Sequence, residues 1–157
     1  MLIEPVLFGL LIAEDPHQPA AREIAAVCQH TRAAVAVGAL DSPAQRFIDY
    51  WMGAGTWAGM PPQRRAAVAR AMPGVRSQWT AIFAEPTPLP AYALLDLPVL
   101  YLEGSESPPS TRAVARLLTQ TLPHVTSAEL KDAGHMAPVT HPGLVNAAIQ
   151  EHLARLG

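Results

Sequence analysis

The sequence contains little charge and a single cysteine. Only 15% of its 157 residues are charged, the formal net charge is −2, and no run of basic residues occurs. Such a chain lacks the electrostatic attraction that nucleic acids or anionic membranes require, so we expect neither as a partner. Cys28 alone can form no internal disulfide and no cysteine-based metal site. We therefore expect a reducing, cytoplasmic environment.

The N-terminal residues lack the pattern of a signal peptide. Residues 1–12 are apolar, but they include Glu4 and Pro5, and no positively charged segment precedes them. The run is also shorter than the roughly 20 residues that span a bilayer. What the sequence does contain is apolar side chains, which make up 50% of the chain. This is enough to fill the interior of one compact domain.

The middle of the chain, residues 15–96, predicts helices and no strand. A helix is expected over residues 20–37, and a second begins with Ser42 as its N-cap and a proline in its first turn. Two further helices are expected over residues 62–72 and 75–84. The proline–glycine pair between them is expected to separate the two.

The last third of the chain alternates between strand and helix. Strands are predicted over residues 98–103 and 125–130, and helices over residues 112–122 and 143–156. This order is typical of a parallel sheet whose strands are connected by helices. The apolar residues 1–8 predict one more strand, which Pro5 interrupts. We therefore expect an α/β fold with a short, mainly parallel sheet of about three strands.

A histidine-containing turn lies between the last predicted strand and the last helix, in the motif Gly-His-Met-Ala-Pro at residues 134–138. With the strand–helix–strand pattern before it, this motif resembles the C-terminal portion of the α/β-hydrolase fold. In that fold the catalytic histidine is the last triad member along the chain, and His135 matches it. The resemblance implies a partial α/β-hydrolase fold. Its sheet core would be residues 1–14 and 97–157, with residues 15–96 inserted as an all-helical cap.

The nucleophile that this resemblance implies is missing from the sequence. In the α/β-hydrolase fold it lies in a Gly-x-Ser-x-Gly turn between a strand and a helix. Gly55 and Gly59 have the required spacing, but Trp57 stands at the centre, and no second glycine follows Ser105. We therefore expect a truncated hydrolase whose nucleophile and oxyanion hole lie outside these residues.

The acid that would orient His135 has two alternatives. The usual position, in the turn after the strand at residues 98–103, is occupied by Ser107. Glu4 resembles an alternative acid position used by some members of the family, and a carboxylate within an apolar strand is costly to bury without a partner. We prefer Glu4, although a structural role in binding backbone N–H groups is equally compatible with its position. Glu106 is adjacent to Ser107 and fits a solvated turn residue better.

The expected ligand is a small apolar molecule with an ester or amide-like bond. Trp51, Trp57 and Met136 are predicted to contact it, although the two tryptophans could equally belong to the core of the cap. The resemblance implies no cofactor. His135 and His141 have no cysteine or aspartate at ligand spacing, so no metal site is predicted.

Two functions follow from these observations. The first is hydrolysis by a Ser-His-acid type of mechanism, if the nucleophile is supplied from elsewhere. The second is a truncated, non-catalytic remnant that serves as a binding or scaffolding domain. If the chain is truncated, the first strand would lack a neighbour on one side, so we expect the chain to self-associate along that edge.

Overall fold

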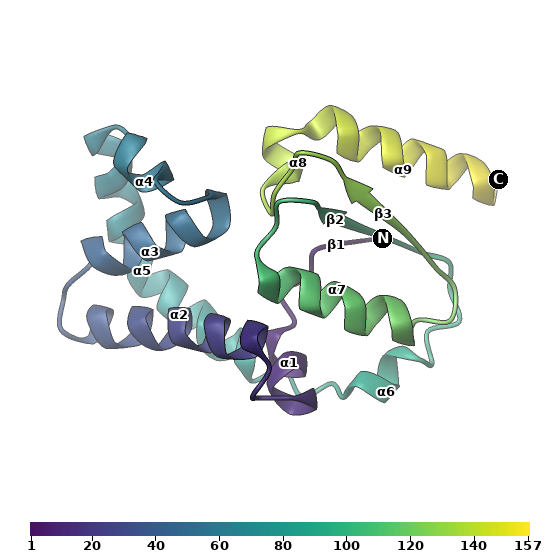
Figure 1. Cartoon of the computed structure of the whole chain (residues 1–157), viewed down its shortest axis with the longest axis horizontal. Helices are drawn as coiled ribbons and strands as arrows, with labels where there is room; N and C mark the ends of the chain where they lie inside the picture. The colour runs from purple at the N-terminus through teal and green to yellow at the C-terminus, as the bar shows by residue number, and fades with distance from the viewer. The chain divides into compact units, whose positions relative to one another are not determined.

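The structure is a computed structural model that describes all 157 residues, and it contains two compact units (Figure 1). Met1–Val6 and Thr87–Gly157 form the sheet unit, which holds all the strands. Leu7–Pro86 form the helical unit. None of the helices is both long and apolar enough to cross a membrane.

The sheet unit is built on three parallel strands in the order β1-β2-β3. They are β1 (Leu2–Ile3), β2 (Val99–Gly104) and β3 (Val125–Leu130). In the central strand, Tyr101 lies beside Leu2 of one neighbour and Ser127 of the other. The predicted α/β class with a short parallel sheet is confirmed.

Helices cover both faces of this sheet (Figure 1). Helix α7 (Pro109–Thr121) lies on one face, and α9 (Pro142–Leu156) packs against β2 and β3 from the other. The short helices α6 (Leu89–Tyr92) and α8 (Ala137–Thr140) precede β2 and α9, respectively. Because side chains alternate along a strand, every second residue of β2 faces α9. The core on that side contains Leu100, Leu102, Leu130, Ala133, Ala137 and Val145.

The helical unit consists of α1 (Phe8–Glu14), α2 (Pro19–Ala36), α3 (Asp41–Met52), α4 (Thr56–Gly59) and α5 (Pro62–Phe83). Helices α1, α2 and α3 each pack against α5. As predicted, residues 15–96 contain no strand.

The first strand is shorter than predicted, and α1 was not predicted. The strand ends after Ile3, because Glu4 leaves the extended conformation with a φ of 39°. From Phe8 onward the apolar residues are helical instead. The Phe8 ring is fully buried, with its centroid 6.1 Å from that of Trp51 and 6.3 Å from that of Trp79. Packing within the helical unit therefore overrides the strand-like pattern.

The two helices predicted on either side of the proline–glycine pair are one helix, and that prediction was wrong. Helix α5 continues through Pro73, which is exposed together with Gly74. Met72 and Trp79, on either side of the proline, are both buried and hold the two halves in line. Ser42 is not an N-cap either. Helix α3 begins at Asp41, two residues earlier than predicted, with Leu40 at the N-cap.

Candidate active site

The turns that follow the three strands meet at one edge of the sheet. Glu4 comes directly after β1, the segment from Ser105 to Ser107 follows β2, and the turn containing His135 follows β3. Parallel strands present their carboxyl ends at the same edge, which is where ligands bind in open α/β sheets. Three distant parts of the sequence thus come together within the sheet unit.

Glu4 and His135 form a hydrogen-bonded pair. The distance from His135 Nδ1 to Glu4 Oε2 is 2.7 Å. The Glu4 side chain is only 3% exposed, whereas the His135 side chain is 21% exposed. An ionised carboxylate has no proton to donate, so Nδ1 carries the hydrogen and donates it to Glu4. The imidazole is therefore held in one tautomer and one orientation by a buried charge.

The electrostatics of the site keep Glu4 ionised. Burial alone would raise its pKa, but the hydrogen bond from His135, the adjacent Ser107 hydroxyl and the Gly104 amide outweigh that effect, so the pKa of Glu4 is lowered. The Gly104 N–H donates to Glu4 Oε1 at 2.7 Å. The Ser107 hydroxyl is buried beside the carboxylate but makes no hydrogen bond of normal geometry. Both carboxylate oxygens are thus satisfied.

The backbone at Glu4 is strained. Its φ of 39° lies in the left-handed region, which non-glycine residues rarely adopt. Strain of this kind costs about 1–3 kcal/mol and persists only where the surroundings impose it. Here the Glu4 N–H donates to the carbonyl of Leu102 at 3.2 Å while its side chain turns toward Gly104. The last backbone bond of β1 and the buried carboxylate together impose this conformation.

The turn after β2 and the histidine turn are joined by two hydrogen bonds. The N–H of Asp132 donates to Ser105 Oγ at 2.9 Å, and the N–H of Glu106 donates to the carbonyl of Ala133 at 3.0 Å. The turn that carries His135 is therefore bonded to the turn that directly follows Gly104. Sequence reasoning did not identify these contacts, because only the fold brings the two turns together.

The other predicted site residues have different surroundings. Glu106 is exposed, as a solvated turn residue would be. Met136 follows the histidine and is 37% exposed. Trp51 and Trp57 belong to the helical unit, and each is 8% exposed. Trp57 packs against Ile48 and Met72, and Trp51 stacks on Phe8, so both contribute to the core of that unit. Their contact with a substrate remains a prediction, as does that of Met136.

No group of three or more histidine, cysteine, aspartate or glutamate side chains is arranged to hold a metal ion. Glu4 and His135 are two titratable side chains joined by a hydrogen bond at this edge of the sheet. A buried carboxylate bonded to Nδ1 directs the opposite nitrogen, Nε2, toward chemistry at the carboxyl edge of the sheet.

Comparison with known proteins relates the fold to a solved structure. No family model and no curated protein matches this chain. The chain is similar to the crystal structure of the putative non-heme bromoperoxidase BpoC from Mycobacterium tuberculosis H37Rv, an α/β-hydrolase. The match has a TM-score of 0.59 at 16% sequence identity, and covers 99% of this chain and 66% of BpoC. The chain thus has part of the α/β-hydrolase fold, including three of its parallel strands.

Proposed function

We propose that Glu4 and His135 are the acid and base of a hydrolytic site. The observation that carries this proposal is the 2.7 Å hydrogen bond between His135 Nδ1 and a buried, ionised Glu4. This arrangement stabilises the imidazolium that forms when a histidine accepts a proton from a nucleophile. The reaction class is hydrolysis of an ester or amide-like bond in a small, apolar substrate.

The roles of the two residues follow from the direction of the hydrogen bond. Nε2 of His135 takes the proton from the attacking group and later returns it to the leaving group. Glu4 stays ionised, fixes the tautomer and holds the ring in place. Met136, next to the histidine and partly exposed, lies where an apolar substrate group would touch the turn.

The nucleophile and the oxyanion hole are supplied from outside these residues. The chain contains no Gly-x-Ser-x-Gly segment, and Trp57 occupies the centre of its nearest match and is buried. The chain spans 66% of the length of BpoC, so a third of that protein has no counterpart here. A base without a nucleophile transfers no acyl group. We therefore expect the 157-residue chain alone to be inactive as a hydrolase.

The absence of a nucleophile also favours the second function, a non-catalytic binding or scaffolding domain. In that case the bond between Glu4 and His135 would serve only to hold β1 and the histidine turn together. The two functions differ in whether turnover depends on His135 once a nucleophile is present.

The test begins with the coding DNA upstream of Met1, where an in-frame Gly-x-Ser-x-Gly segment is expected. The extended protein is then assayed with a p-nitrophenyl ester of a short fatty acid. His135→Ala should lower turnover by about 10⁴-fold or more, and Glu4→Gln by about 10²- to 10⁴-fold. The matched controls are His141→Ala and Glu106→Gln, which should retain activity.

An extended protein whose turnover is the same with and without His135 would contradict the proposal. Turnover by the 157-residue chain alone that is lost in His135→Ala would support the role of His135. It would contradict the expectation that the nucleophile lies outside the chain. If no upstream segment of this kind exists, the non-catalytic function is favoured.

A further inference from the structure

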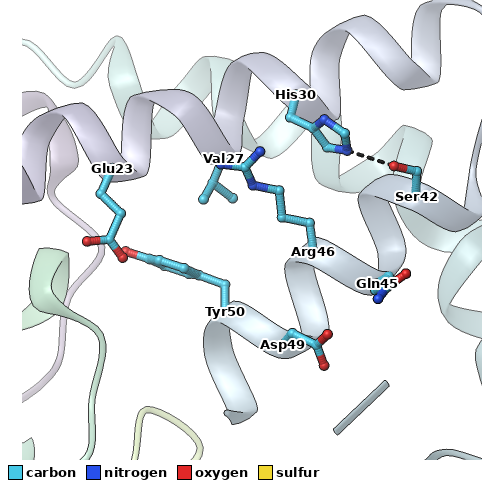
Figure 2. A pocket seen from close by; sticks show the side chains of 8 residues that line it. All are labelled: Glu23, Val27, His30, Ser42, Gln45, Arg46, Asp49 and Tyr50. Carbon is cyan, nitrogen blue, oxygen red and sulfur yellow. Dashed lines mark hydrogen bonds between the residues drawn. The ribbon is translucent and has the colours of Figure 1, made fainter. Parts of the chain in front are cut away.

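A polar groove lies between α2 and α3 of the helical unit (Figure 2). Its volume of about 470 Å³ falls within the range of sites for small molecules. Both helices contribute charged or polar side chains to it. The lining residues are Glu23, Val27, His30, Ser42, Gln45, Arg46, Asp49 and Tyr50.

Two charged side chains of opposite sign line this groove without a partner. Glu23 of α2 and Arg46 of α3 form no ion pair and no hydrogen bond with any residue of the chain. Figure 2 shows the Arg46 side chain extending from α3 toward Val27, while Glu23 and Tyr50 line another part of the groove. The groove therefore presents a cationic and an anionic group at different points along its length.

The remaining polar groups are held in place. His30 Nε2 and Ser42 Oγ are 2.9 Å apart and link α2 to α3 at one end of the groove. Asp49 Oδ1 accepts the backbone N–H of Trp57 at 2.8 Å. Asp49 forms no ion pair with Arg46, three residues earlier on the same helix. Val27 is 2% exposed and gives the groove an apolar floor.

We propose that this groove binds a small zwitterion, a molecule that carries a carboxylate and an ammonium group separated by several bonds. The carboxylate pairs with the guanidinium of Arg46, whose planar donors match its two oxygens. The ammonium group pairs with Glu23, and the apolar chain between the charges lies along Val27 and the Tyr50 ring. A simple anion fits less well, because Glu23 and Asp49 would repel it.

The test titrates the full chain with 6-aminohexanoate and follows backbone amide signals by two-dimensional NMR. Hexanoate and hexylamine, which each carry one of the two charges, are the comparison ligands. We expect saturable shifts in α2 and α3 with 6-aminohexanoate, and affinity at least about tenfold weaker for either singly charged ligand. Equal affinity for all three ligands, or no saturable shift with the zwitterion, would overturn the proposal.

Two variants test whether Arg46 and Glu23 bind the two charged groups of the ligand. Arg46→Gln and Glu23→Gln should each weaken binding of 6-aminohexanoate by about tenfold. Neither side chain belongs to the buried core, so both variants should fold. The matched controls are Arg64→Gln and Glu14→Gln, at exposed positions of the same unit outside the groove. The site lies wholly in the helical unit, so this outcome is independent of the chemistry proposed for Glu4 and His135. Unchanged binding in both groove variants would also contradict the proposal.

Discussion

The backbone of Gly104 approaches the carbonyl group of Ala133 so closely that a Cβ atom on Gly104 would lie 2.2 Å from its oxygen. The same atom would lie 2.8 Å from Ser107 Oγ. No real side chain is tolerated at such distances from backbone atoms. Glycine is therefore required at the end of β2, where its N–H also binds the Glu4 carboxylate.

Gly104→Ala should destabilise the sheet unit. Insertion of one methyl group into packed surroundings costs about 1–3 kcal/mol, and here backbone must move to accommodate it. The free energy of unfolding should be measured from NMR signals of the Leu100 and Leu102 methyl groups during urea titration. Tryptophan fluorescence would not serve, because all three tryptophans lie in the helical unit. Gly143→Ala is the control, since nothing lies within 4 Å of its Cβ position. Equal stability of both variants would contradict the close approach.

The stability of the sheet unit should depend on pH through Glu4. Burial raises the pKa of this carboxyl, but hydrogen bonding to His135, Ser107 and Gly104 has the larger, opposite effect. The pKa of Glu4 in the folded protein is therefore lowered. In the unfolded chain its pKa is about 4.3. Ionised Glu4 therefore contributes stability above about pH 4.3, and this contribution is lost as the pH falls through the lower folded-state pKa.

Glu4→Gln should lower the free energy of unfolding by about 1–3 kcal/mol at pH 7, because a hydrogen-bonded charge is removed from a buried site. The difference between variant and wild type should shrink as the pH falls toward 3. NMR-monitored urea unfolding at pH 7, 5, 4 and 3 measures it. Glu106→Gln is the matched control and should follow the wild type, since Glu106 is exposed. A difference that stays constant over this pH range would rule out the assigned ionisation.

Pro73→Ala should stabilise the helical unit. A proline inside a helix costs about 3 kcal/mol, because it removes one backbone hydrogen bond and crowds the preceding turn. Pro73 is exposed, so its replacement removes no core contact. Tryptophan fluorescence during urea unfolding reports on this unit. Pro16→Ala, in an exposed turn of the same unit, is the control. If the helix were interrupted at the proline, as its sequence predicts, the variant would gain little.

The chain should self-associate along the outer edge of β1. This strand has only β2 as a neighbour, and an unpaired edge offers N–H and C=O groups to another chain. The Glu4 amide binds Leu102 of β2. Since successive amides of a strand point to opposite edges, the Ile3 amide is directed outward. We expect a rise in average mass with concentration by light scattering, together with slower hydrogen exchange at Ile3. A monomer at all concentrations would contradict this expectation.

The sheet and its histidine turn were predictable because their signals are local. The strand–helix–strand alternation and the motif around His135 are each visible within a short segment. Glu4 was conspicuous as a carboxylate among apolar residues. The hydrogen bond from Gly104 and the left-handed conformation of Glu4 were not predictable, since both depend on strands that meet only in the fold.

The helical unit was harder to predict for a different reason. The Pro73–Gly74 pair is a strong local signal for a break, yet burial of Met72 and Trp79 on either side outweighs it. Glu23 and Arg46 look like ordinary surface charges on two separate helices. Only the packing of α2 against α3 makes them the opposite walls of one groove.

The hydrogen bonds that join the two turns of the sheet unit also have a kinetic consequence. The amide of Asp132 is protected by Ser105, and the amide of Glu106 by the backbone of Ala133. Neither turn can open without breaking both bonds. The two amides should therefore exchange with solvent through one shared opening event, with equal opening free energies, although they lie in different loops. Any fluctuation that releases the histidine turn would then also free the turn that follows Gly104, the residue whose amide supports the acid.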